Sequence, residues 1–264
     1  MRLFACLLAL LAVGGASCGG SGGGPKQDVP DKPPRALASR CGPEGRNVKA
    51  QLVWFRASDG ILLDGAAIGD GETAVVLAHE YPSNLCLWLP YAKTLATHGF
   101  RAFVFDLRGM GDSQSAKAYE DADRYDRDVE AAAAEVRRLG AKKVFLAGAS
   151  IGGAAVLAAG AFVTPEPAGI ISFSGETYVS DEIDALKAAP KLSAPLLLLV
   201  ARHDGYVTVD DYRKLEAKAG SQNKQLVVYA DSWHGWDLLY TAPFKARVNK
   251  LVLGFLKEHS ADGD

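Results

Sequence analysis

The sequence has little net charge, few cysteines and no long apolar run. Its 29 Lys and Arg residues nearly balance its 31 Asp and Glu residues, giving a formal charge of −2. Because residues of either sign are interspersed, no strong field attracts nucleic acid, and polyanion binding is excluded. With 264 residues and 48% hydrophobic content, the chain can bury one sizeable core. We therefore expect a single folded domain.

Signals for cofactors and metals are also missing. No cluster of metal-ligating residues stands out, and the glycine-rich stretch at residues 148–153 lacks the lysine of a phosphate-binding loop. The sequence therefore predicts neither a cofactor nor a metal.

The longest apolar run lies at the start of the chain. Residues 3–13 follow Arg2 and are followed by small residues. A membrane-spanning helix needs about 20 apolar residues, so this run is too short to span a bilayer. Its pattern is typical of a signal peptide, which we place at residues 1–17.

Cys18 directly follows this segment. The residues before it, Gly14, Gly15, Ala16 and Ser17, resemble the lipobox of bacterial lipoproteins, although Gly15 stands where that motif usually has an aliphatic residue. The resemblance implies lipidation of Cys18 and anchoring of the protein in the cell envelope. Ordinary secretory cleavage, which leads to a periplasmic or secreted protein, and an uncleaved anchor are the alternatives. All three imply export.

A segment poor in core-forming residues follows Cys18. Residues 19–24 are all Gly or Ser, and Pro residues recur at 25, 30, 33 and 34. A segment of this composition buries too little apolar surface to offset the entropy lost on folding. It favours a flexible chain over the Gly and Ser residues and a semi-extended chain over the Pro residues. We expect a tether over residues 18–48 and the folded domain over residues 49–264.

Two cysteines remain for the folded part. Cys6 belongs to the leader and Cys18 to the lipobox, which leaves Cys41 and Cys86 in an oxidising compartment. A disulfide between them would close a loop of about 45 residues and stabilise the fold by about 3 to 4 kcal/mol. Two unpaired thiols are the alternative.

From residue 51 onward, short apolar runs alternate with helical patterns. This alternation is typical of βαβ units in a mostly parallel sheet, and residues 59–60 read as a hairpin turn. The predicted strands are 52–56, 62–67, 74–78, 102–105, 144–147, 170–173, 196–200 and 226–229. The predicted helices are 85–97, 126–139, 152–161, 210–219 and 243–258, with one short helix within 181–189.

A serine stands between a predicted strand and a predicted helix. Ser150 has a glycine two residues before it, Gly148, and another two residues after it, Gly152. This spacing fits a strained strand-to-helix turn that exposes the serine at the carboxyl edge of the sheet. Over roughly residues 50–258 the chain resembles the α/β-hydrolase family. The resemblance implies an eight-stranded, mostly parallel sheet flanked by helices, and the short segment 174–194 implies a minimal lid or none.

The same resemblance implies an acid and a base after later strands. Asp204 follows the strand at 196–200, and His234 follows the strand at 226–229, in the family order Ser, Asp, His. A carboxylate there can orient the imidazole, which can take the proton of Ser150 near neutral pH. Glu176, after the preceding strand, is the alternative acid.

Backbone N–H groups are expected to form the oxyanion hole. The resemblance implies the N–H of Ile151, after the nucleophile, and that of Tyr81 in the loop after the strand at 74–78. That loop carries Glu80 where the family usually has glycine. Because a carboxylate facing inward would oppose an oxyanion, we expect Glu80 to face outward. His79 is expected to be structural.

Other residues near this edge are read as scaffold or as cleft lining. Asp106 and Arg108 lie in a glycine-rich turn typical of the family, where we expect an ion pair to tie loops together. Aromatic residues could line an acyl-binding cleft, with core packing as the alternative for each. These are Trp88, Tyr178, Tyr206 and Trp233, together with Tyr81 and Trp236.

These residues predict acyl transfer to water. Ser150 would attack a small-molecule carboxylic ester, as in small carboxylesterases and dienelactone-hydrolase-like members, although the latter carry cysteine at this position. One alternative is a peptidase resembling the catalytic domain of prolyl-oligopeptidase-like proteins. Another is an inactive, lipid-anchored binding protein, since fold alone does not guarantee activity. Oligomeric state is not predicted.

Overall fold

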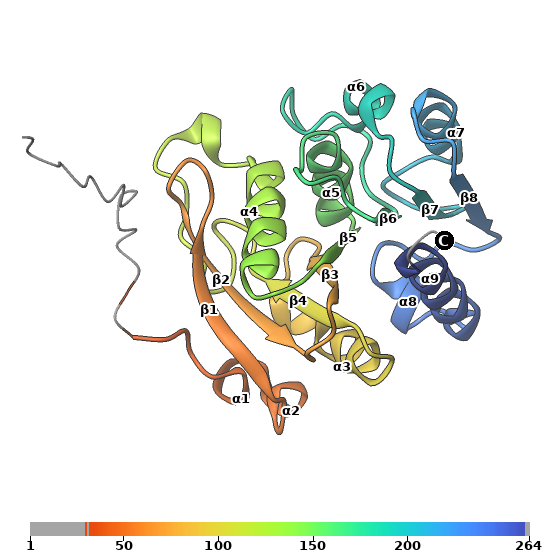
Figure 1. The fold of residues 1–264 in the computed structure, drawn as a ribbon. Helices are drawn as coiled ribbons and strands as arrows, with labels where there is room; N and C mark the ends of the chain where they lie inside the picture. Colours follow the sequence, from red (N-terminus) through yellow and green to blue (C-terminus); the bar gives the residue numbers. More distant parts are fainter. Residues whose placement is uncertain (1–29, 31, 262–264) are drawn as a thin grey trace, which may run out of the picture.

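The computed structural model describes residues 30 and 32–261, and it contains one eight-stranded sheet (Figure 1). The strand order is β1-β2-β4-β3-β5-β6-β7-β8. β1 and β2 form an antiparallel hairpin, β2 pairs antiparallel with β4, and the remaining neighbours are parallel. The predicted mostly parallel sheet is therefore confirmed.

The strand bounds lie close to those expected from the sequence. Strands inside the sheet are covered on both faces and therefore consist of continuous apolar runs; in β7, for example, every residue is buried. The edge strand β1 has exposed and half-buried positions. The strands are β1 Ala50–Arg56, β2 Leu62–Ile68, β3 Thr73–Ala78, β4 Arg101–Phe105, β5 Lys143–Ala149, β6 Gly169–Phe173, β7 Leu196–Ala201 and β8 Lys224–Tyr229.

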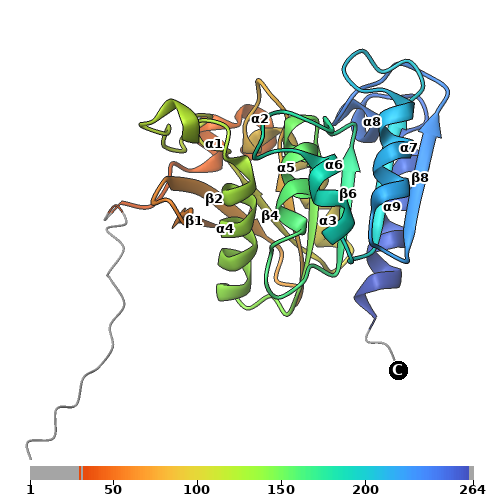
Figure 2. The same ribbon diagram turned by 90° about the horizontal axis from the view of Figure 1, so that it is seen from above.

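Helices cover both faces of the sheet (Figures 1 and 2). One core lies beneath α4 (Tyr125–Arg138), α5 (Ile151–Gly160) and α7 (Val209–Lys218). The other lies beneath α3 (Leu89–Thr97), α8 (Asp237–Tyr240) and α9 (Lys245–Ser260). Short 3-10 turns occur at Leu85–Trp88, Tyr119–Asp121 and Ala189–Lys191. Among the described residues, no helix is both long and apolar enough to span a bilayer.

The connection from β6 to β7 is short. It contains one turn of helix, α6 (Ala185–Ala188), followed by the 3-10 turn Ala189–Lys191. Because no larger insertion stands between β6 and β7, this connection adds only a small cap at the carboxyl edge of the sheet. The minimal lid expected from the sequence is present.

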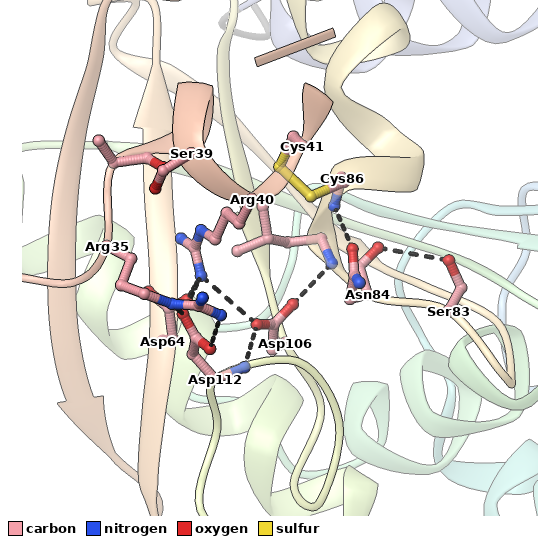
Figure 3. The surroundings of a disulfide bond; sticks show 12 residues. Arg35, Ser39, Arg40, Cys41, Asp64, Ser83, Asn84, Cys86, Asp106 and Asp112 are labelled. Atoms are coloured by element: carbon pink, nitrogen blue, oxygen red, sulfur yellow. Dashed lines mark hydrogen bonds and ion pairs between the residues drawn. A yellow bond between two sulfur atoms is a disulfide. The ribbon is translucent and has the colours of Figure 1, made fainter. Parts of the chain in front are cut away.

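The chain before β1 is folded from residue 37 onward, where the sequence predicted a tether to residue 48. Two short helices, α1 (Leu37–Arg40) and α2 (Gly42–Gly45), are joined at Cys41. Cys41 forms a disulfide with Cys86, with their Cα atoms 5.3 Å apart (Figure 3). We call residues 35–45 the N-terminal clamp. The predicted signal peptide at 1–17 and Cys18 lie outside the described residues.

Charges hold the clamp to the sheet beside the disulfide. Arg40 Nη1 donates to the fully buried Asp64 of β2 and lies 3.1 Å from Asp112 Oδ2 (Figure 3). Arg35 Nε donates to the same Asp112 oxygen at 2.7 Å. Breaking a buried pair leaves an uncompensated charge, so these contacts fix where the clamp docks. This long-range pairing overrides the disorder favoured by the preceding Gly and Pro residues.

Candidate active site

A sharp turn between β5 and α5 positions Ser150. Its φ of 50° and ψ of −125° lie outside the usual regions for residues with a side chain, so the backbone is strained there. The glycines on either side permit this turn. A Cβ on Gly148 would lie 2.2 Å from the Gly152 carbonyl oxygen, and one on Gly152 would lie 2.4 Å from that of Ala78. Ser150 therefore stands at the carboxyl edge of β5.

Asp204 and His234 meet at this edge from the loops after β7 and β8. His234 Nδ1 lies 2.8 Å and 2.9 Å from the two carboxylate oxygens of Asp204. Asp204 Oδ1 also accepts the N–H groups of Tyr206, at 2.9 Å, and Val207, at 3.3 Å. Because an ionised carboxylate only accepts, Nδ1 carries the proton, and Nε2 is left to act as a base.

The electrostatics of this pair follow from its contacts. Burial alone would lower the pKa of His234, but the hydrogen bond and charge of Asp204 outweigh it and raise this pKa above 6.5. Burial alone would raise the pKa of Asp204, but the imidazole and the Tyr206 N–H lower it below its ordinary value. Asp204 is thus ionised at neutral pH.

The raised pKa of His234 predicts a pH dependence of activity. A general base must be neutral, so kcat/KM should fall as the pH drops through the pKa of His234. Since Asp204 raises that pKa, we expect the midpoint of the acidic limb to lie above pH 6.5. Rates of p-nitrophenyl acetate hydrolysis at constant ionic strength would measure it. A midpoint below 6.5 would contradict the upward shift that Asp204 is expected to cause, and loss of the acidic limb in His234→Ala would identify His234 as its source.

The Ser150 hydroxyl contacts Glu176 in this structure. Ser150 Oγ donates to Glu176 Oε1 at 3.0 Å, and within the described part of the chain it makes no hydrogen bond to His234. Ser150 and the His234 loop nevertheless adjoin, because a Cβ on Gly235 would lie 3.6 Å from Ser150 Cβ. In this arrangement the hydroxyl proton is directed at Glu176 and not at His234. The sequence placed Glu176 only as an alternative partner of the imidazole.

Glu80 faces inward, so the prediction of an outward side chain is wrong. Its Oε2 accepts the backbone N–H of Trp236 at 2.9 Å and thereby joins the loop after β3 to the His234 loop. Gly235 permits this approach, since its φ is +53° and a Cβ there would lie 2.2 Å from Glu80 Oε2. Burial raises the pKa of Glu80, against the opposing effect of the Trp236 N–H.

Two backbone N–H groups are free at the same edge. Neither the Ile151 N–H, at the start of α5, nor the Tyr81 N–H has a hydrogen-bond acceptor among residues 32–261. The intervening loop is held by buried His79, whose Nδ1 lies 2.9 Å from the Glu80 carbonyl oxygen and whose Nε2 accepts the Leu107 N–H at 3.0 Å. His79 therefore packs as scaffold.

Arg108 and Asp106 are also scaffold, but they do not form the expected ion pair. Arg108 is fully buried and donates to Asp128 at 2.7 Å and to Asp59 at 2.7 Å. Asp106 instead accepts the N–H groups of Leu85 and Asp112, at 2.7 and 2.8 Å. The two side chains thus tie different loops to the sheet.

The aromatic residues proposed for a cleft divide into three groups by burial. Trp88 is fully buried against Tyr91 and Phe173, so its assignment to substrate binding is wrong. Trp233 and Trp236 are half-buried and pack against the core beneath α8 and α9. Three tyrosines are exposed on loops at the carboxyl edge of the sheet: Tyr81, Tyr178 and Tyr206. The Tyr206 ring lies 4.5 Å from the His234 ring, measured between centroids.

The described residues contain no group of three His, Cys, Asp or Glu side chains able to hold a metal ion.

Comparison with known proteins supports the fold. A family profile described as serine aminopeptidase, S33 matches residues 69–183, which include the strand-to-helix turn at Ser150. No curated protein matches the sequence significantly.

Solved structures of esterases and a lipase share the fold. An esterase from Pyrococcus furiosus is 20% identical, with a TM-score of 0.70 over 86% of this chain and 98% of that one. An esterase from Thermogutta terrifontis is 20% identical, with a TM-score of 0.63 over 80% and 100%. A monoacylglycerol lipase from Paleococcus ferrophilus is 18% identical, with a TM-score of 0.63 over 75% and 99%.

Proposed function

We propose that this chain is a hydrolase of the α/β-hydrolase superfamily and that it hydrolyses carboxylic esters through an acyl-enzyme on Ser150. The observation that carries the proposal is the 2.8 Å contact between His234 Nδ1 and Asp204, at the edge where Ser150 stands on its strained turn. Such a contact keeps the proton on Nδ1 and leaves Nε2 as the nitrogen that can accept a proton.

In the proposed reaction, Ser150 Oγ bonds to the ester carbonyl carbon and its proton moves to His234 Nε2. The oxyanion accepts hydrogen bonds from the N–H groups of Ile151 and Tyr81. The C–O bond to the alcohol breaks, and the alcohol leaves with the proton from His234. Water then attacks the acyl carbon, gives a proton to His234, and releases the acid as Ser150 regains its proton.

The competing activity is cleavage of peptide bonds, which the name of the matching family suggests. Hydrolysis of p-nitrophenyl acetate and of amino-acid p-nitroanilides should be compared on the same protein. We expect ester turnover to be the faster by far. Rapid anilide cleavage without ester turnover would establish a peptidase. Failure of a fluorophosphonate probe to label Ser150 in folded protein would support the third alternative, an inactive binding protein.

Replacement of Asp204 by asparagine should lower kcat by about 10³ to 10⁴-fold. An amide at this position can donate to Nδ1 and favour the imidazole tautomer that cannot accept the proton of Ser150. Steady-state hydrolysis of p-nitrophenyl acetate measures this, with Asp210→Asn at an exposed position as the control. A larger loss in Glu176→Gln than in Asp204→Asn would assign the acid to Glu176.

We further propose export of the protein and lipidation at Cys18, which would anchor residues 49–264 to the cell envelope through the segment before the N-terminal clamp. The proposal is supported by the leader-like sequence and by the Cys41–Cys86 disulfide, which suits an oxidising compartment.

Replacement of Cys18 by serine should move the protein from the membrane to the soluble fraction, because the thiol that carries the lipid is lost. Fractionation and immunoblotting in an expressing bacterium would measure this. Cys6→Ser, which changes only the leader, is the matched control and should leave partitioning unchanged. Equal membrane recovery of Cys18→Ser and the parent protein would refute lipidation at this residue.

A further inference from the structure

Two carboxylates beside the nucleophile have no cation as a partner. Glu176 Oε1 accepts the Ser150 hydroxyl at 3.0 Å, and its other oxygen is buried without a hydrogen-bond partner. Glu80 Oε2 is held by the Trp236 N–H at 2.9 Å, next to Gly235. Within residues 32–261, neither carboxylate forms an ion pair with Lys or Arg. Both contribute negative potential at His234, in addition to Asp204.

This arrangement is unfavourable for a neutral ester. Attack by Ser150 creates an oxyanion close to Glu176, and like charges repel more strongly at a half-buried site than in water. A positive charge on the substrate would offset that repulsion and would pair with the carboxylates. The charge distribution around Ser150 therefore discriminates between substrates by their charge.

The exposed tyrosines provide the second observation. Tyr81, Tyr178 and Tyr206 are 69%, 58% and 76% exposed, and they follow β3, β6 and β7 at the carboxyl edge that carries Ser150. Tyr81 adjoins Glu80 in sequence, Tyr178 lies two residues after Glu176, and Tyr206 packs on His234. Exposed aromatic faces attract organic ammonium groups. Carboxylates and tyrosine rings at one edge are the chemistry that recognises an ammonium ion.

We propose that the preferred substrates are esters that carry an ammonium group close to the scissile carbonyl, and that Glu176 is the residue that selects for this charge. The inference rests on the proposed esterase function and names its substrate class. Glu80, held next to Gly235, adds a second carboxylate near His234, and the tyrosines lie at the same edge of the sheet. Displacement of the Ser150 hydroxyl from Glu176 by the ammonium group would also free the hydroxyl for His234.

The test uses pairs of esters of equal shape and different charge. Acetylcholine and 3,3-dimethylbutyl acetate differ only in having nitrogen or carbon at the branched centre of the alcohol. Betaine methyl ester and methyl 3,3-dimethylbutanoate differ in the same way in the acyl group. For at least one pair, the cationic-to-neutral ratio of kcat/KM should fall about tenfold in Glu176→Gln, the order expected when one unit charge is removed from such a site. Comparing ratios between proteins cancels the intrinsic reactivity of each ester.

Glu182→Gln is the matched control, because Glu182 lies on the same connection, its side chain is 58% exposed, and its loss changes the net charge equally. It should leave both ratios unchanged. Added salt should lower the wild-type ratio through screening, which gives a readout independent of whether Glu176→Gln folds. If neither Glu176→Gln nor salt alters these ratios, and the protein still hydrolyses p-nitrophenyl acetate, the inference about substrate charge is overturned and the proposed esterase function stands. Absence of all ester hydrolysis would overturn the proposed function as well.

Discussion

Replacement of Ser150 by alanine should lower kcat/KM for p-nitrophenyl acetate by about 10⁵-fold or more and should abolish labelling by a fluorophosphonate. The reason is that the proposed acyl-enzyme needs an oxygen at this position, and no other hydroxyl stands on the strained turn between β5 and α5. The protein should still fold, because the turn depends on the close approach of Gly148 and Gly152 to neighbouring backbone. Circular dichroism and thermal unfolding would verify this.

A second variant separates chemistry from stability. Ser150→Gly removes the same hydroxyl but adopts a φ of 50° without strain, so it should unfold at a higher temperature than the parent protein while remaining inactive. Ser232→Ala, on an exposed loop serine, should change neither activity nor labelling. More than about one hundredth of parental activity in both Ser150 variants would exclude the acyl-enzyme on Ser150.

Replacement of His234 by alanine should lower kcat/KM for the same ester by about 10⁵-fold. The imidazole is the only group held by Asp204 in the position of a base, and a water molecule cannot replace a base tuned to neutral pH. The remaining rate should also lose the acidic limb that His234 confers on the parent protein. Stopped assays across the pH range would measure both effects.

His203→Ala is the matched control for this variant. His203 is exposed on the loop that carries Asp204, and it should be replaceable with little change in rate. Retention of activity within about tenfold by His234→Ala would remove His234 from the mechanism, and a comparable loss in His203→Ala would point to damage of the loop instead.

The positions of the strands and the turn at Ser150 could be predicted because local sequence determines them. The buried strand β7 is a continuous apolar run, and the glycines around Ser150 are required by distances to adjacent backbone. These signals lie within a few residues of the feature they predict. The antiparallel hairpin of β1 and β2 was likewise visible in its Asp59-Gly60 turn.

The details that were missed depend on contacts between distant segments. Glu80 turns inward because the Trp236 N–H, 156 residues later, needs an acceptor and Gly235 makes room for it. Asp128 lies in the first turn of α4, where a carboxylate suits the helix dipole, yet it is fully buried and bonds Arg108. Neither partner can be chosen from spacing along the chain, because both depend on how the loops meet after folding.

Trp88 shows the limit for aromatic residues. An aromatic ring close in sequence to the loop after β3 can face either a cleft or the core. Only the packing of the folded chain decides which of the two it faces. Here the 3-10 turn Leu85–Trp88 directs the ring against Phe173 of β6. The leader and the lipobox stay predictions, since they lie outside the described residues.

The N-terminal clamp also bears on how the protein can be handled. The chain enters the domain at a covalent link between Cys41 and Cys86, reinforced by Arg40 on Asp64. Mechanical load applied upstream of residue 35, by a fusion partner or by attachment to a bead, is therefore taken up at this link before it can reach β1. Immobilisation through the N-terminus under non-reducing conditions suits this protein for that reason.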